Sequence, residues 1–192
     1  MSKLKLVVLG STRGTNMQAI IDAIADSQLD ASIELVISNR KNAYILERAN
    51  EHKILNKFIS AKDKTREDYD LELIQEITKH NPDIVLLIGF MRILSGEFID
   101  AFDGRILNIH PSLLPKHAGL MDLAVHQSVI DAKDKKSGCT IHQVSEKVDG
   151  GDIILQLECD VMDNDTAESL KERVQALESK AWVKVIRDWS KV

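Results

Sequence analysis

Short apolar runs alternate with amphipathic stretches through the first half of the chain. Leu4–Leu9 is a short, mostly apolar run, and residues 84–88 are five consecutive aliphatic residues; such runs are typical of strands buried on both faces of a parallel sheet. Apolar residues at helical spacing follow each run, so the pattern predicts strand–helix units. The further elements expected in this half are helices over residues 16–27, 43–52 and 95–102, a helix that begins at Thr65, and strands over residues 33–37, 58–59 and 106–109.

Helix boundary signals support this division of the chain. Thr65-Arg-Glu-Asp68 has the form of a capping box, in which the threonine hydroxyl accepts a hydrogen bond from a backbone N–H of the first turn. Asn81-Pro82 ends the same helix, because the residue before a proline avoids the helical conformation. Ser95 is a suitable cap for the short helix that follows it.

The second half of the chain has a different pattern. Residues 139–144 alternate between the two faces of a strand, and residues 153–157 form another strand. Asp149-Gly-Gly-Asp152 between them is a turn, so we expect the two strands to pair as a hairpin. Apolar residues then recur at steps of three or four over residues 170–185, which predicts one long final helix docked on the sheet. Lys133-Asp-Lys-Lys136 is typical of a solvated loop.

Together these elements predict an α/β fold with an open, mostly parallel, Rossmann-like sheet, a C-terminal hairpin and a long final helix. The 192 residues, of which 44% are hydrophobic and 29% charged, suit one soluble domain over residues 1–192. Two cysteines exclude a disulfide framework, and no segment reaches the ~18 apolar residues of a membrane helix. The N-terminal apolar run is too short for a signal peptide, so we expect a cytoplasmic protein. The net charge of −5 argues against nucleic-acid and membrane surfaces.

The loop between the first strand and the first helix has the character of a phosphate cradle. Gly10-Ser-Thr-Arg-Gly-Thr-Asn16 combines two glycines with a helix N-terminus, where free N–H groups favour an anion. The loop lacks the Gly-Lys-Ser/Thr of a P-loop and the glycine spacing of a dinucleotide fingerprint. A plain tight turn with Asn16 as helix cap is the alternative. An NADP-binding module also stays open, because Arg40 stands where an acidic residue would favour NAD.

The centre of the chain carries the candidate chemistry. Asn108 and His110 lie two residues apart at a strand end, so both side chains point to one face. Pro111 and Pro115 stiffen the loop that follows. An amide and an imidazole of near-neutral pKa form a suitable pair for polarising a carbonyl and moving a proton.

Asp149 is the third candidate for this chemistry. Its place in an Asp-Gly turn has a purely conformational explanation, in which the carboxylate binds its own backbone. A functional interpretation is that the carboxylate orients a histidine and raises its pKa. The six histidines and two cysteines show no spacing typical of zinc ligands, so we predict no metal site.

Four motifs in chain order carry a resemblance to a known family: Gly14-Thr-Asn16, Gly89-Phe-Met-Arg-Ile-Leu94, Asn108-Ile-His-Pro-Ser-Leu-Leu-Pro115 and Asp149-Gly-Gly151. The set resembles the phosphoribosylglycinamide formyltransferases (GAR transformylases) among the folate-dependent formyltransferases. The resemblance implies the formyltransferase fold and formyl transfer from N10-formyltetrahydrofolate to the amine of 5-phosphoribosylglycinamide, a step of de novo purine biosynthesis. It also implies small-molecule partners only and a monomer or a homodimer.

The resemblance further implies a division of labour within the one domain. Residues 1–105 would form the half that binds the phosphate substrate, and residues 106–192 the folate and catalytic half. The implied site residues are Asn108, His110 and Asp149 for catalysis; Gly14, Thr15, Asn16, Gln175 and Glu178 for the ribosylglycinamide phosphate; and Arg66, Met91, Arg92, Ile93, Leu94 and Asn108 for the folate.

The sequence departs from the family pattern after Pro115. Many relatives continue with an aromatic residue and a proline, whereas this chain has Lys116-His-Ala-Gly-Leu120, and the stretch up to Gly138 is longer. The conformation of this loop is therefore not predicted. A hydrolase that removes formyl from the same folate would share the catalytic trio and is the alternative activity.

Overall fold

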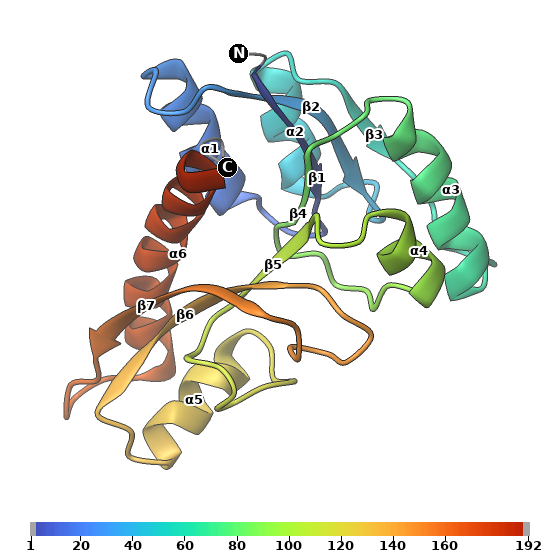
Figure 1. The fold of residues 1–192 in the computed structure, drawn as a ribbon. Coiled ribbons are helices and arrows are strands. Elements are labelled where there is room, and N and C mark those ends of the chain that lie inside the picture. Colours follow the sequence, from blue (N-terminus) through green and yellow to red (C-terminus); the bar gives the residue numbers. More distant parts are fainter. Residues whose placement is uncertain (1–2, 190–192) are drawn as a thin grey trace.

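The computed structural model describes residues 3–189 and contains one seven-stranded sheet with strand order β3-β2-β1-β4-β5-β6-β7 (Figure 1). The first five strands are parallel to one another, and β6 pairs antiparallel with both β5 and β7. The strands are β1 (Leu4–Leu9), β2 (Ala31–Ser38), β3 (Asn56–Phe58), β4 (Ile84–Leu87), β5 (Ile106–His110), β6 (Lys136–Gln143) and β7 (Ile153–Asp160). The helices are α1 (Thr15–Ala25), α2 (Tyr44–Glu51), α3 (Arg66–Thr78), α4 (Gly96–Ala101), α5 (Leu123–Asp131) and α6 (Ala167–Trp189). The predicted open, mostly parallel α/β fold with a hairpin and a long final helix is confirmed.

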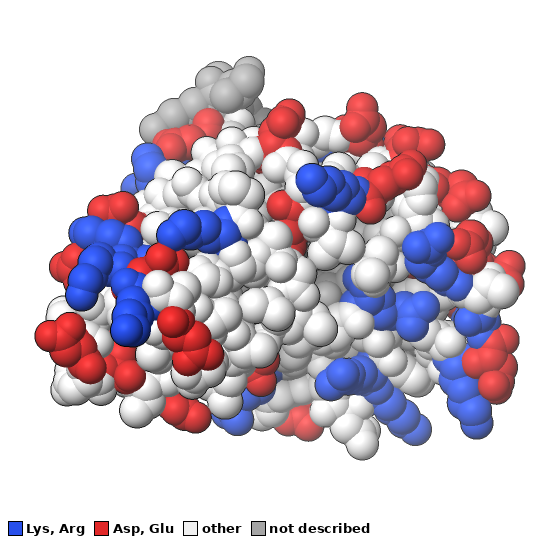
Figure 2. Space-filling model, turned by 90° about the horizontal axis from the view of Figure 1, so that it is seen from below, with Lys and Arg blue, Asp and Glu red and all other residues white. Residues whose placement is uncertain are grey.

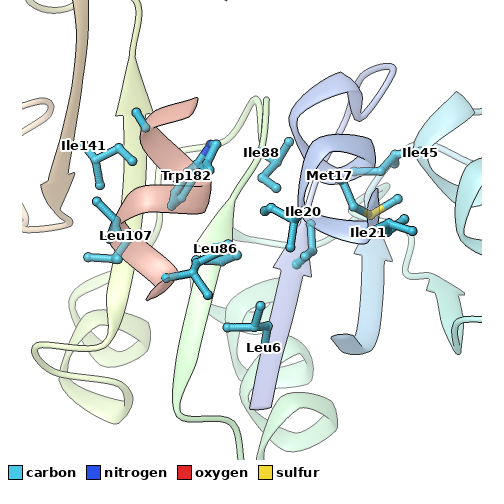
Figure 3. Packing of buried hydrophobic residues seen from close by; sticks show 14 of the residues in the cluster. Leu6, Met17, Ile20, Ile21, Ile45, Leu86, Ile88, Leu107, Ile141 and Trp182 are labelled. Carbon is cyan, nitrogen blue, oxygen red and sulfur yellow. The ribbon is translucent and has the colours of Figure 1, made fainter. Parts of the chain in front are cut away.

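Each face of the sheet carries its own apolar core, because successive strand residues point to opposite faces. In β1, Leu6 and Val8 belong to the core under α1, α2 and α6, while Val7 and Leu9 belong to the core under α3 and α4. Figure 3 shows the first of these cores, with Trp182 of α6 among side chains from β4, β5 and β6. Within residues 3–189, no helix is long and apolar enough to cross a membrane.

Two of the predicted helix caps are confirmed. The Thr65 hydroxyl accepts from the Asp68 N–H at 3.1 Å, and the Ser95 hydroxyl accepts from the Phe98 N–H at 3.3 Å. The alternative interpretation of Asn16 as the cap of the first helix is wrong. Gly14 occupies that position with φ 68°, a left-handed conformation that glycine adopts without strain, and no side chain caps α1.

Helix α5 is the element that the sequence pattern did not predict. Its buried residues are Val125, His126 and Val129, so its apolar face is short and contains a polar residue. Asp122 precedes it with φ 53° and makes no capping hydrogen bond, so the start of the helix lacks a sequence signal as well. The solvated loop expected at 133–136 is one residue shorter, because β6 begins at Lys136.

The strand directions place the site. The strands β1, β2, β4 and β5 run downward in Figure 1, and their carboxyl ends face the side shown in Figure 2. Ligands of open α/β sheets bind at this edge, where the strand order reverses. The antiparallel register of β5 and β6 also brings His142 opposite Asn108 at the same edge.

Candidate active site

His110 and Asp149 form an ion-pair geometry at the end of β5. The distance from His110 Nδ1 to Asp149 Oδ2 is 3.2 Å, and the two side chains are only 5% and 9% exposed. Asp149 lies on the turn between β6 and β7, 39 residues later in the chain, so the pairing predicted for these residues depends on the hairpin. The structure therefore brings together the imidazole and carboxylate that sequence reasoning selected.

Asn108 joins this pair through a residue that sequence reasoning missed. The Asn108 amide lies 3.2 Å from His142 Nε2, and the same nitrogen lies 3.6 Å from Asp149 Oδ1. His142 Nδ1 donates to the Gln143 carbonyl at 2.8 Å, which leaves Nε2 facing the site. The signal for His142 was its strand register, because alternation over residues 139–144 places it on one face and the pairing with β5 brings that face to Asn108.

Backbone conformation holds the Asp149 carboxylate in place. Asp149 has φ 53°, a left-handed value that few non-glycine residues adopt, and its carboxylate lies beside His110. Its Oδ2 accepts from the Gly119 N–H at 2.8 Å. The carboxylate therefore fastens the loop after β5 to the catalytic side chains, instead of binding its own turn.

The two central groups have perturbed pKa values. Burial is the largest influence on the pKa of His110 and lowers it below the ordinary value, although Asp149 and the His117 carbonyl act to raise it. Burial acts to raise the pKa of Asp149, but the neighbouring His142 ring, the hydrogen bond from the Gly119 N–H and the charge of His110 hold it below its ordinary value. Asp149 is therefore ionised at neutral pH. The predicted raising of the histidine pKa by Asp149 is present but weaker than the effect of burial.

The second nitrogen of His110 also has a fixed partner. His110 Nε2 lies 3.0 Å from the backbone carbonyl oxygen of His117, in the loop whose sequence departs from the family pattern. This loop turns tightly at Pro115, which follows a cis peptide bond, and His117 has φ 60°. The imidazole of His110 therefore faces an acceptor at each ring nitrogen.

The N-terminus of α1 lies at the same edge of the sheet and is open to a ligand. Gly14 is buried and Thr15 is exposed, and no side chain caps the free N–H groups of the first turn. A Cβ on Gly14 would lie 2.5 Å from Ile45 Cγ1, so glycine is required here by packing as well as by its φ of 68°. The structure therefore retains the anion-binding features expected of this loop.

The side chains of Asn16 on α1 and Glu178 on α6, which the resemblance assigns to the same substrate, are in contact. The Asn16 amide donates to Glu178 Oε2 at 2.8 Å, and the Ser179 hydroxyl donates to Asn16 Oδ1 at 3.1 Å. Burial raises the pKa of Glu178, although the hydrogen bond from Asn16 opposes this shift. Gln175, one turn earlier on α6, is exposed.

Ser11 ties the glycine loop to the loop after β4 and was not selected from the sequence. Its N–H donates to the Gly89 carbonyl at 3.0 Å, and its hydroxyl donates to Asn39 Oδ1 at 2.6 Å and accepts from the Met91 N–H at 3.0 Å. Residues 91–94 therefore stand beside the α1 N-terminus. Met91 and Ile93 are 41% and 59% exposed, whereas Leu94 is buried.

Two arginines, Arg92 and Arg66, lie in or near the loop after β4. The Arg92 guanidinium lies 4.7 Å above the ring of Tyr69, and its Nε is buried without a hydrogen-bond partner among the described residues. Arg66 at the start of α3 is exposed and pairs only with its neighbour Glu67 among the described residues. Figure 2 shows this face with a largely uncharged centre and with Lys and Arg side chains gathered to either side.

No cluster of three or more His, Cys, Asp and Glu side chains within residues 3–189 is placed to hold a metal ion. The side chains at the site are an amide, two imidazoles and a carboxylate, arranged around one strand end. Such a set can donate hydrogen bonds to a developing oxyanion and can transfer a proton.

Comparisons with known proteins find relatives along nearly the whole chain. The sequence pattern of the formyl transferase family matches residues 4–186. The phosphoribosylglycinamide formyltransferase of Escherichia coli is 41% identical over 184 residues, which cover 95% of this chain and 85% of that protein. The trifunctional purine biosynthetic protein adenosine-3 of Chironomus tentans is 43% identical, but the chain spans only 14% of its length.

A solved structure has the same architecture. The glycinamide ribonucleotide transformylase 1 of Symbiobacterium toebii superposes with a TM-score of 0.94 at 36% sequence identity. The match covers 99% of this chain and 89% of that one. The likeness therefore extends over nearly every element of the sheet and its helices.

Proposed function

The chain belongs to the formyl transferase family, and we propose that it transfers the formyl group of N10-formyltetrahydrofolate to the amine of 5-phosphoribosylglycinamide. The products are formylglycinamide ribonucleotide and tetrahydrofolate, in de novo purine (IMP) biosynthesis. The observation that carries the proposal is the meeting of Asn108, His110 and Asp149 at the carboxyl end of β5, beside an uncapped helix N-terminus. The protein acts on small molecules in the cytoplasm, as a monomer or a homodimer.

The acceptor lies along α1 and α6 in this proposal. Its phosphate takes hydrogen bonds from the backbone of Gly14 and Thr15, where the helix dipole favours an anion. Asn16, Gln175 and Glu178 face its ribose, and the hydrogen bond between Asn16 and Glu178 holds two of these side chains ready. The acceptor amine then points along the sheet edge toward Asn108.

The folate lies between the loop after β4 and the loops of the second half. Met91 and Ile93 offer exposed apolar surface to the pterin, and the backbone of residues 91–94 supplies hydrogen-bonding groups. Arg92 and Arg66 offer cationic groups to the anionic end of the folate. The formyl group on N10 meets the acceptor amine at Asn108.

The reaction requires stabilisation of an oxyanion and transfer of a proton. The acceptor amine attacks the formyl carbon, and the Asn108 amide and protonated His110 donate hydrogen bonds to the oxygen that becomes negative. As the bond from carbon to N10 breaks, a proton reaches N10 and the attacking nitrogen loses one. His110 exchanges these protons, and Asp149 stabilises the imidazolium form. Negative charge on the substrate counteracts the lowering of the His110 pKa by burial.

Identification of the product tests the proposal. The purified protein is incubated with both substrates, and the nucleotide fraction is analysed by mass spectrometry. The proposal predicts an acceptor that gains one formyl group in amounts equal to the tetrahydrofolate released. Free formate with an unmodified acceptor would instead identify the hydrolase alternative. A hydrolase would need no phosphate-binding site at the N-terminus of α1.

A further inference from the structure

We propose that Ser11 is a positioning residue for the folate, although it lies in the glycine loop that the proposed function assigns to the acceptor. Its hydroxyl holds the N–H of Met91. This contact sets where residues 91–94 present their backbone to the pterin. The role of Ser11 deepens the proposed function and rests on it for the identity of the ligand.

Ser11 lies where three loops meet at the carboxyl edge of the sheet. Its hydroxyl donates to Asn39 Oδ1 at 2.6 Å, just after β2, and accepts from the Met91 N–H at 3.0 Å, in the loop after β4. A backbone N–H can only donate and a hydroxyl has one hydrogen, so the two contacts use different capacities of the same oxygen. Because Ser11 is only 2% exposed and its one hydrogen is already bound, its hydroxyl orders the neighbouring loops and does not itself bind a ligand.

The backbone beside Ser11 also packs closely against the loop after β4. The Ser11 N–H donates to the Gly89 carbonyl at 3.0 Å. Gly89 has φ 61°, and a Cβ on it would overlap with Oγ1 of Thr12. The start of the loop after β4 therefore takes its position from the glycine loop.

Residues 92–94 depend on anchors to either side of them. Their backbone N–H and C=O groups make no hydrogen bond to any residue within 3–189. On one side, Ser11 holds the Met91 N–H; on the other, the buried Asp70 carboxylate accepts from the Ser95 N–H at 2.6 Å. The free backbone groups suit a ligand with donors and acceptors along one edge, as a pterin has. Loss of either anchor would move these groups and weaken binding of the folate.

Binding of tetrahydrofolate, the product of the proposed reaction, tests the role of Ser11 without turnover. Calorimetry under anaerobic conditions gives its Kd for the wild type and for Ser11→Ala, and a parallel titration gives the Kd of 5-phosphoribosylglycinamide. In the variant, the Kd of tetrahydrofolate should rise about tenfold, as for one lost hydrogen bond at a buried group, and that of the acceptor should change by less than about twofold. The two KM values should separate in the same way.

Ser38→Ala is the matched control. Ser38 is also a buried serine at the end of a strand on this edge, but its hydroxyl accepts from the Arg40 N–H at 3.1 Å. It makes no hydrogen bond to residues 10–16 or 89–95 in the described part of the chain. Ser38→Ala should lower Tm but leave both Kd values unchanged. A loss of tetrahydrofolate affinity in Ser11→Ala no larger than in Ser38→Ala, or an equal loss for both ligands, would overturn the proposal.

Amide hydrogen exchange reads the loop directly. In the wild type, the Met91 amide should be protected, and the amides of residues 92–94 should exchange rapidly until tetrahydrofolate is added. An unprotected Met91 amide would overturn the proposal. Asn39→Ala, which keeps Ser11 but removes the partner of its hydroxyl, should weaken the protection of Met91 and raise the Kd of tetrahydrofolate about threefold, so the test does not depend on the folding of Ser11→Ala.

Failure of the proposed function has a different signature. A wild-type protein that protects the Met91 amide but does not bind tetrahydrofolate would contradict the proposed function, and Ser11 would remain only an anchor of the loop. A wild-type protein that binds tetrahydrofolate as tightly as Ser11→Ala does would contradict the positioning role and leave the proposed function intact.

Discussion

The two ends of the site present different chemical groups. At the acceptor end, the main features are backbone N–H groups of α1 and the buried pair of Asn16 and Glu178. At the catalytic end, the rings of His110 and His142 lie beside the Asp149 carboxylate, and burial lowers the pKa of His110. Under the proposed function, this difference predicts that acceptor affinity and reaction rate can be changed separately. Substitutions at one end should change binding, and those at the other should change kcat and its pH dependence.

The largest effect is expected at the catalytic end. His110→Ala and Asp149→Asn should each lower kcat by at least about a hundredfold, on the scale of a lost oxyanion donor or a lost acid–base group. The measurement is kcat at saturating substrates for both single variants. Thermal unfolding serves as the control and should change little, because neither residue belongs to an apolar core.

The combination of these variants tests whether the catalytic end acts as one unit. Because Asp149 acts through its 3.2 Å contact with His110, removal of His110 also removes the effect of the carboxylate on the reaction. The double variant should therefore be far less impaired than the product of the two single losses. Multiplicative losses in kcat would show that the two residues act independently.

Asn16→Ala should have the next largest effect, and at the other end of the site. Loss of the amide frees Glu178 and removes the ribose contact that we propose for Asn16, so the KM for the acceptor should rise about tenfold, as for a hydrogen bond to a charged group. The dissociation constant for the folate, measured by calorimetry, should stay unchanged. Equal losses for both ligands would contradict the separation of the two ends.

The pH dependence of the catalytic end provides a smaller effect with a defined sign. Burial lowers the pKa of His110 and Asp149 raises it, so His110 gains its proton only as the pH falls. Asp149→Asn should lower this pKa further, and the limb of the pH–kcat profile that reports His110 should move to lower pH. A limb that moves to higher pH in the variant would contradict the assigned role of the carboxylate.

The smallest effect is one on stability at the acceptor end. Because burial raises the folded-state pKa of Glu178 above its unfolded value, ionisation of this residue costs stability as the pH rises through the folded pKa. Glu178→Gln should therefore raise Tm at pH 8 by about 2–4 °C for each 1 kcal/mol recovered. The gain in Tm over wild type should shrink as the pH falls to 4. A lower Tm at pH 8 would show that the charge is stabilising.

The sequence allowed prediction of the sheet and of most helices because their signals are local. The apolar runs at Leu4–Leu9 and 84–88 form central strands, and the caps at Thr65 and Ser95 form as expected. Helix α5 was missed because its buried face includes His126 and its first turn has no cap. Where the burial pattern is short and interrupted, periodicity gives no signal.

The sequence indicated which residues belong to the candidate site, but it indicated few of the contacts between them. The resemblance selected Asn108, His110 and Asp149, but the roles of His142 and His117 depend on the β5–β6 register and on a loop at positive φ. Ser11 likewise gains its role from a hydrogen bond to a residue 80 positions later in the chain. Such contacts join segments far apart in sequence, so no local pattern reports them.

The central claim is that the acceptor at the α1 end takes the formyl group released at the His110 end. The most direct measurement is the steady-state release of tetrahydrofolate from N10-formyltetrahydrofolate, with and without 5-phosphoribosylglycinamide. The account predicts that release depends on the acceptor and that saturation with acceptor sets the rate. Release that is equally fast without the acceptor would contradict the account and identify water as the nucleophile.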